Sequence, residues 1–310
     1  MRLLLFTRTL VFAGASLALT AGSFALMSCA HKPDGAKVDS SLNTLVPSDT
    51  VLMAGTRLEA LLKTQVYQHN FAGRQFPQIE EFAQRTGLDP RKDLWELLYV
   101  ANGRQGVLLG RGKFGDEMMQ PKFEKEGMQT FAYKGATLIG NDHGAMLLIN
   151  PTTAALGDIP SLHSFIDQRA SSHGPPPAMT ALLKEIPPDA QFWGAYAGGP
   201  IHLPFDNNPV LANLNKLLST VQTGTVYFDL RTGVSGVAAA TCANDDGAQE
   251  VAGALKALVG IGRLSVPKNQ PDLAQVYDSI RVTQEGMRVK LYIDVPEVMA
   301  DKFLKMWIGK

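Results

Sequence analysis

The sequence has few cysteines and no net charge, and both features exclude classes of protein. Two cysteines, Cys29 and Cys242, occur in 310 residues, which is too few for a disulfide framework, so a hydrophobic core has to stabilise the fold. The 29 basic residues equal the 29 acidic ones. Because nucleic-acid binding requires a basic patch or stripe, we expect no nucleic-acid partner.

Motifs of catalytic and metal-binding chemistry are also missing. The closest sequence to an esterase nucleophile motif, Gly233-Val234-Ser235-Gly236, is one residue short and falls in a predicted hairpin. No two histidines are four residues apart and there is no H-E-x-x-H; the six are His31, His69, His143, His163, His173 and His202. We therefore expect no catalytic residue, no metal site and no cofactor, and we predict that the protein is not an enzyme.

Two local patterns that suggest chemistry have simpler structural explanations. The sequence Asn244-Asp245-Asp246-Gly247 is too short for a calcium loop. We expect Asp246 to be the N-cap of a helix, with Glu250 near its first turn. Cys242 follows an alanine-rich strand pattern and has no basic neighbour in the sequence, so we expect a buried and unreactive thiol.

The N-terminal residues carry the pattern of an export signal. Arg2 and Arg8 give a positively charged start, and an uncharged apolar stretch follows over residues 10–26. The residues Leu26-Met27-Ser28-Cys29 resemble the lipobox of bacterial lipoproteins, although Met27 departs from the Ala, Ser or Thr usual at that position. The resemblance implies that signal peptidase recognises Leu26, Met27 and Ser28, and that Cys29 carries acyl chains such as palmitate.

Two alternatives to lipidation stay open. The first is an ordinary secretory cleavage, for instance after Ala25, that leaves Cys29 free. The second is an uncleaved signal anchor, because the apolar stretch 10–26 is at the lower limit of membrane-spanning length. Lipidation is favoured by the segment that follows, because residues 30–43 are polar without apolar periodicity, as in a flexible tether. Two acyl chains are enough to anchor a protein stably.

The remaining sequence predicts an α+β body with mostly antiparallel sheet. The proline-rich stretch 171–177 divides the body into two halves. Each half is predicted to contain the same order of elements: a strand, a helix, a hairpin, a helix, further strands and a helix. We therefore predict a diverged duplication. Helices at 116–126 and 210–219 belong to this pattern. The predicted regions are a signal peptide (1–28), a flexible tether (29–45), a first repeat (46–170), a linker with a short helix (171–185) and a second repeat (186–310).

Part of the body resembles an uncharacterised family of bacterial envelope proteins. The residues that carry the resemblance are Phe131-Ala132-Tyr133-Lys134-Gly135, Ala155-Leu156-Gly157-Asp158, Phe165-Ile166-Asp167, and Ile186-Pro187-Pro188-Asp189-Ala190 with Tyr196. They correspond to the family's pattern of Tyr-Lys-Gly, Ile-Asp and Leu-Pro-x-Asp-Ala. The resemblance covers roughly residues 46–200. It implies an extracytoplasmic α+β protein and supplies no activity, ligand or site residue.

These features together predict a membrane-anchored envelope lipoprotein with a noncatalytic binding or structural role. Its partner would be an envelope protein, a glycan or a lipid. The residue after Cys29 is Ala30 rather than aspartate, so the lipoprotein resemblance implies the outer membrane, facing the periplasm. Two alternatives remain: a carrier of lipid or another small ligand, and a hydrolase whose site assembles only in space.

Overall fold

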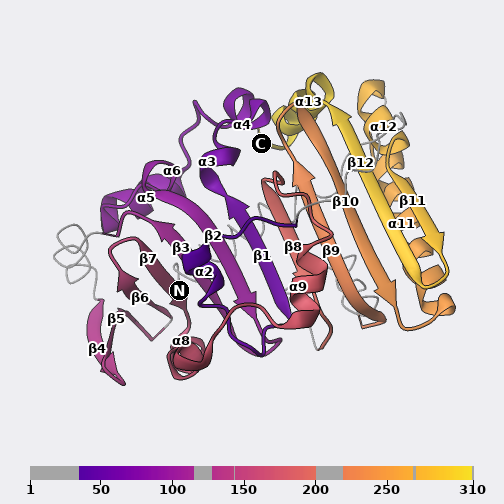
Figure 1. Ribbon diagram of the computed structural model, residues 1–310. Coiled ribbons are helices and arrows are strands. Elements are labelled where there is room, and N and C mark those ends of the chain that lie inside the picture. Colours follow the sequence, from indigo (N-terminus) through magenta and orange to yellow (C-terminus); the bar gives the residue numbers. More distant parts are fainter. Residues whose placement is uncertain (1–34, 115–127, 143, 200–218, 268–269, 309–310) are drawn as a thin grey trace. The chain divides into compact units, whose positions relative to one another are not determined.

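The computed structural model describes residues 35–114, 128–142, 144–199, 219–267 and 270–308 (Figure 1). The described chain forms two compact units. Residues 38–62 and 73–177 make the first unit, and residues 63–72 and 178–310 belong to the second together with the segment that ends at Lys37. In the described part of the chain, no helix is both long and apolar enough to cross a membrane.

The first unit is built on an antiparallel sheet with the strand order β1-β2-β3-β7-β6-β5-β4. Buried and more exposed positions alternate along β1, as expected for strands with one face on a core. The strands are β1 (Leu52–Arg57), β2 (Leu94–Ala101), β3 (Gly106–Gly112), β4 (Gln129–Tyr133), β5 (Ala136–Asn141), β6 (Gly144–Asn150) and β7 (Thr153–Gly157).

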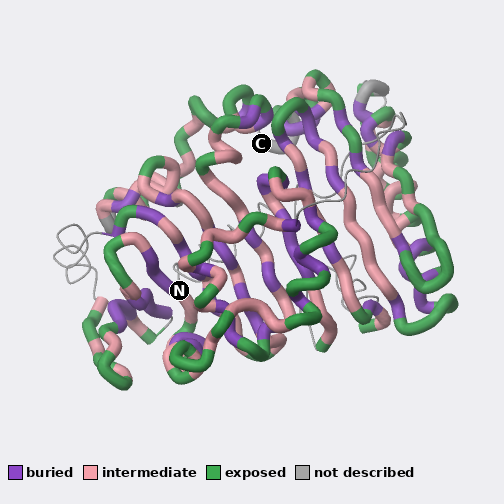
Figure 2. Tube along the Cα trace, viewed as in Figure 1, coloured by how far each residue is buried: buried purple, intermediate pink, exposed green. Residues whose placement is uncertain are grey.

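Short helices connect and cover these strands. Proline is the first residue of α5 and of α6 and the second residue of α8. In the first turn of a helix the missing backbone N–H costs no hydrogen bond. Leu97 and Ile139 from the sheet form a buried core with Phe114, and Figure 2 shows the buried positions along the strands. The helices are α2 (Ser40–Asn43), α3 (Leu58–Leu61), α5 (Pro77–Thr86), α6 (Pro90–Asp93) and α8 (Ile159–Gln168), followed by η2 (Arg169–Ser171).

The second unit has its own antiparallel sheet, with the order β8-β9-β10-β12-β11. Helix α11 packs on it through Val251 and Ala252, which meet Val221 and Val289 in a buried cluster. The strands are β8 (Phe192–Tyr196), β9 (Val221–Asp229), β10 (Gly233–Cys242), β11 (Arg281–Glu285) and β12 (Arg288–Pro296). The helices are α4 (Gln65–Asn70), α11 (Asp245–Leu264), α12 (Pro271–Asp278) and α13 (Glu297–Ile308), while α9 (Pro177–Leu183) begins at the boundary of the units.

The predicted fold class is confirmed: the protein is α+β with a large antiparallel sheet. The predicted turn at Lys134-Gly135 joins β4 to β5, with φ of 48° and 81° at these two residues, the positive values that a two-residue hairpin needs. Helix α12 was not predicted. The helices predicted at 116–126 and 210–219 lie outside the described residues, and the duplication stays a prediction.

Two local predictions are corrected by the structure. Residues 38–45, expected to be flexible tether, belong to the body because Leu42 is fully buried within the short helix α2. The N-cap of α11 is Asn244, whose side chain accepts a hydrogen bond from Gly247 N, and Asp246 lies in the first turn. Asn is as good an N-cap as Asp, and the helix dipole favours an acidic first turn.

Candidate functional site

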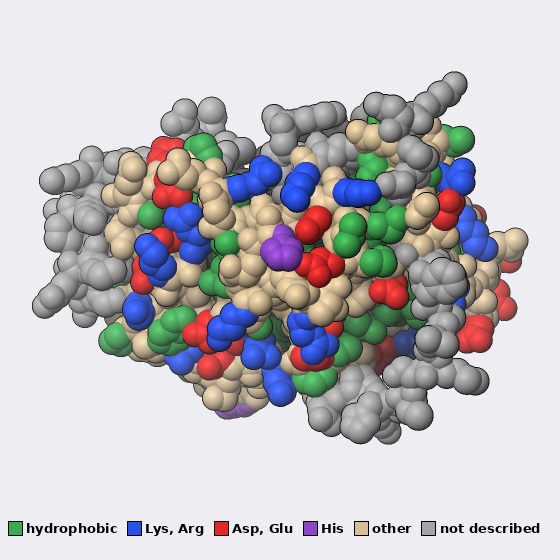
Figure 3. All heavy atoms as spheres, turned by 90° about the horizontal axis from the view of Figure 1, so that it is seen from above, with side chains coloured by type: hydrophobic (Ala, Val, Ile, Leu, Met, Phe, Trp, Pro, Cys, Tyr) green, Lys and Arg blue, Asp and Glu red, His purple; other side chains and the backbone are tan. Residues whose placement is uncertain are grey.

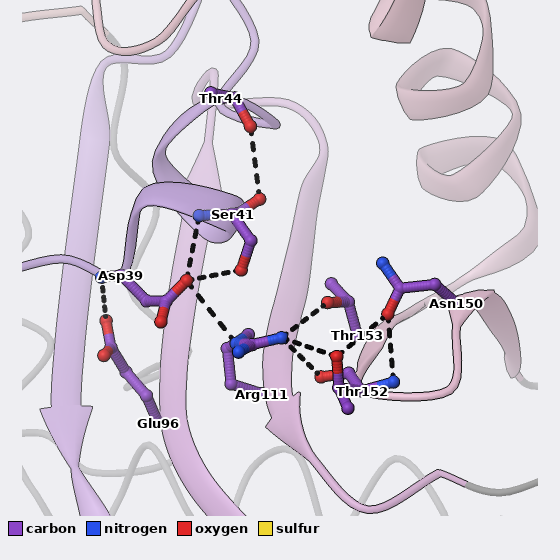
Figure 4. Close-up of polar contacts among 8 residues, drawn as sticks. All are labelled: Asp39, Ser41, Thr44, Glu96, Arg111, Asn150, Thr152 and Thr153. Carbon is purple, nitrogen blue, oxygen red and sulfur yellow. Dashed lines mark hydrogen bonds and ion pairs between the residues drawn. The ribbon is translucent and has the colours of Figure 1, made fainter.

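The first polar cluster surrounds Arg111, near the end of β3 (Figure 4). Its Nη1 donates to Thr152 Oγ1 at 2.6 Å and to the Thr152 carbonyl at 3.3 Å. Its Nε lies 3.4 Å from Asp39 Oδ1 in an ion pair. Trp95 lies beside the guanidinium, with 5.5 Å between the Arg111 Cζ and the ring centroid, a distance at which a cation is attracted to the ring.

Asp39 connects this cluster to the N-terminal segment. As the N-cap of α2, its carboxylate accepts hydrogen bonds from Ser41 N at 2.8 Å and from the Ser41 hydroxyl. Its backbone N–H donates to Glu96 Oε1 at 3.0 Å. Polar groups of Asp39 therefore contact both β2 and β3, and the fully buried Leu42 follows within one helical turn. We call Asp39, Glu96, Arg111 and Thr152 the Asp39 network.

The two carboxylates of this network have pKa values that shift in opposite directions. Burial opposes ionisation of Asp39, but hydrogen bonds from Ser41 and the Arg111 guanidinium outweigh it and hold the pKa of that carboxyl below its usual range. Burial raises the pKa of Glu96, and the negative charge of Asp39 adds to the rise. The arrangement holds the anionic side chain of Asp39 and the backbone N–H beside it, so it attaches the segment around Asp39 to β2 and β3 of the first unit.

The predicted processing residues Leu26, Met27, Ser28 and Cys29 lie outside the described residues. Asp39 is the tenth residue after Cys29. An extended chain covers at most about 3.5 Å per residue, so ten residues span up to about 35 Å. Among the described residues, the Ala36 N–H donates to the Leu183 carbonyl at 2.8 Å, and the Asp39 network then supplies the first side-chain ion pair and helix cap of this segment.

Two parts of the Tyr-Lys-Gly and Ile-Asp pattern meet in space. The Tyr133 hydroxyl donates to Asp167 Oδ2 at 3.2 Å, and Lys134 Nζ lies 2.7 Å from Asp167 Oδ1. The hydrogen bond from Lys134 is the main cause that lowers the pKa of Asp167. The contact fastens the β4–β5 turn to α8. In the second unit, Asp189 of the third part pairs with Arg231 at 2.7 Å.

A shallow hollow of about 20 Å³, open to solvent, lies in the first unit. Several of its polar groups are occupied: Asn102 donates to Asp49 Oδ2 at 2.8 Å, and the Ser161 hydroxyl accepts from Gly106 N at 3.3 Å. These bonds fix the loop between β2 and β3 and the start of α8. The hollow is lined by Pro47, Asp49, Thr50, Asn102, Gln105 and Ser161, among others.

Sequence reasoning treated the histidines as isolated, but the structure brings one of them to two carboxylates. His69 Nδ1 on α4 lies 2.8 Å from Glu297 Oε1 and 3.5 Å from Asp301 Oδ2, both on α13. More than two hundred residues of sequence separate the histidine from its partners, so no local motif signals the cluster. His163 stacks on Tyr133 with 3.6 Å between ring centroids. His31, His143 and His202 lie outside the described residues.

The two other candidate nucleophiles from the sequence, Cys242 and Ser235, both lie in strand β10. Cys242, at the end of β10, is fully buried as predicted, and burial raises the pKa of its thiol. Ser235, the serine of the incomplete esterase motif, lies in β10 opposite Asp229 of β9. The hairpin predicted for this segment is therefore confirmed.

Comparisons with known proteins give a likeness of fold alone. No family model matches the chain and no curated protein matches it. The solved structures similar to it include crystal forms I, III and IV of TP0453, with TM-scores of 0.48, 0.49 and 0.44 and 11% sequence identity in each case. The matches cover 87%, 88% and 86% of this chain, and 97%, 99% and 95% of the TP0453 chains.

Proposed function

We propose that this protein is an envelope lipoprotein whose α+β body has a noncatalytic binding or structural role. In this proposal residues 1–28 are removed on export, and acyl chains on Cys29 hold the body at the outer membrane, facing the periplasm. The observation that carries the proposal is the sequence Leu26-Met27-Ser28-Cys29, which stands at the end of an apolar stretch and before a short polar segment. The partner would be an envelope protein, a glycan or a lipid.

The place where the polar segment reaches the body supports this proposal. A tether transmits force only if its body end is fixed, and the Asp39 network fixes it through an ion pair, a helix cap and a backbone hydrogen bond. With about ten residues between Cys29 and Asp39, the anchoring point on the body stays within about 35 Å of the acyl chains. The body would therefore work close to one membrane surface.

The polar clusters described above also support a noncatalytic role. Asp39 and Asn244 cap helices, and the Asp167 carboxylate fastens a turn to a helix through Tyr133 and Lys134. The helix caps and the contacts of the turn explain why these polar side chains occur at their positions. The role left to the body is then recognition of a partner through its surface, or mechanical connection of the membrane to another envelope component.

The experiment that tests the anchor uses the full-length gene with its own signal. Cys29→Ala should move the protein from the membrane pellet to the soluble envelope fraction and abolish incorporation of labelled palmitate. The matched control is Cys242→Ala, which removes the other cysteine and should stay membrane-bound and labelled. A Cys29→Ala protein that still pellets after a high-salt wash would show that an uncleaved helix, and not a lipid, is the anchor.

A further inference from the structure

We propose that His69, Glu297 and Asp301 form a binding site for a divalent first-row transition-metal ion, with Zn²⁺ as the expected occupant. All three residues belong to the second unit. The face over α4 and α13, seen from above, carries a histidine side chain beside acidic side chains (Figure 3). This proposal is independent of the lipid anchor.

The geometry of the three ligand atoms suits a small metal ion. His69 Nδ1, one oxygen of Glu297 and one oxygen of Asp301 all lie within 4.8 Å of one another. Zinc bonds of about 2.0–2.1 Å in a tetrahedron separate the ligand atoms by about 3.4 Å. The distance from His69 Nδ1 to Asp301 Oδ2 is 3.5 Å, and the 2.8 Å to Glu297 Oε1 has to lengthen by only about half an ångström.

The helices supply the ligands from two directions. Glu297 and Asp301 are four residues apart on α13 and so lie on the same face of that helix. The imidazole comes from α4, which packs against α13. An imidazole nitrogen with two carboxylate oxygens is a donor set that zinc accepts, and the two negative charges balance the charge of the ion. The His69 side chain is 51% exposed, which leaves a path for the ion and room for water at a fourth position.

Amide side chains hold each carboxylate by the oxygen that does not face the histidine. Asn70 Nδ2 donates to Asp301 Oδ1 at 2.6 Å. We assign the Gln65 amide in the orientation that satisfies both of its ends, in which the nitrogen donates to Glu297 Oε2 at 3.1 Å and to the Arg231 carbonyl at 3.3 Å. Oε1 of Glu297 and Oδ2 of Asp301 are thus the oxygens left facing His69. This is the arrangement that orients carboxylate ligands in metal sites.

Asn70, which holds the Asp301 carboxylate, is a buried amide with one atom unpaired among the described residues. The residue is only 3% exposed, and its Nδ2 also donates to the Val66 carbonyl at 3.0 Å. Its buried Oδ1 has no hydrogen-bond partner among the residues that the structure describes. An unsatisfied buried acceptor destabilises a fold. A helix that needed only packing at this position would carry an apolar residue, whereas a metal ligand needs the amide donor that Asn70 supplies.

The test measures Zn²⁺ binding to the tag-free protein, purified in detergent from the full-length gene, after treatment with a chelator. Isothermal titration calorimetry should give one Zn²⁺ per chain, and His69→Ala and Glu297→Gln should each weaken binding at least tenfold. Asn70→Leu should also weaken it, because Asp301 loses its donor. Cobalt absorption should report a four-coordinate site in the wild type. The matched control is His163→Ala, which removes a histidine of the first unit and should leave the affinity unchanged.

A second readout separates lost binding from lost folding. Saturating Zn²⁺ should slow amide hydrogen exchange in α4 of the wild type and of His163→Ala, with no such change in Glu297→Gln, whose circular dichroism should match the wild type. Absence of stoichiometric binding to the chelator-treated wild type would overturn the proposal. So would binding that His69→Ala and Glu297→Gln leave unchanged, because the ion would then lie elsewhere.

Discussion

The attachment of the N-terminal segment predicts the effect of Asp39→Ala. The substitution removes the N-cap of α2, which is worth about 1 kcal/mol. It also removes the ion pair with Arg111, which is partly exposed and worth about 0.5 kcal/mol. Arg111 keeps its bonds to Thr152, so we expect no larger penalty. The free energy of local opening of α2 should therefore fall by about 1.5 kcal/mol, or about tenfold in the opening equilibrium.

Native-state hydrogen exchange of the Leu42 and Asn43 amides measures this opening directly, because both amides donate to the Asp39 carbonyl. A double-mutant cycle with Arg111→Ala isolates the ion-pair contribution. The matched control is Asp158→Ala, which removes the N-cap of α8 by breaking a 2.7 Å bond from Ser161 N and should speed exchange in α8 only. Unchanged exchange of Leu42 and Asn43 in Asp39→Ala would refute our account of how this segment is held.

Two further predictions concern titratable groups. Because burial raises the pKa of Glu96 above that of the unfolded chain, its charged form destabilises the fold at neutral pH. Glu96→Gln should therefore be more stable than wild type to urea at pH 7, and the gain should vanish below about pH 4, where the carboxyl is protonated in both states; an equal gain at both pH values would contradict this. In a Cys29→Ala variant, where Cys242 is the one remaining cysteine, the native protein should react with a thiol reagent more than about a hundredfold slower than the urea-unfolded protein. The reason is that the buried thiol must first become exposed by local opening. A native rate close to the unfolded rate would show that the thiol is accessible.

Local sequence chemistry was sufficient to predict much of the sheet. Hairpin turns such as Lys134-Gly135 require positive φ values that few residue types adopt. Similarly, Gly87 ends α5 in the left-handed region, with φ of 76°. These signals act within a few residues, so they can be read without the fold. Helix α12 was missed although Pro271 marks its first position, because it has only eight residues and few buried apolar positions, among them Leu273 and Val276.

The candidate metal site and the end of the tether could not be predicted for a different reason. Both depend on contacts between residues far apart in sequence: Asp39 meets Arg111, and His69 meets Glu297. The polar stretch before residue 45 has the composition of a tether, but the buried Leu42 and the contacts of Asp39 hold its last residues in the body. Periodicity is too weak a signal for a helix of four residues.

The membership of residues 63–72 in the second unit has a consequence for the order of folding. Helix α4 leaves the ribosome early, but its partner α13 is the last helix of the chain. During synthesis, α4 cannot form its native contacts with α13 until residues 297–308 have been made. Truncation before residue 297 should therefore leave the early segment, as well as the C-terminus, without its place in the structure.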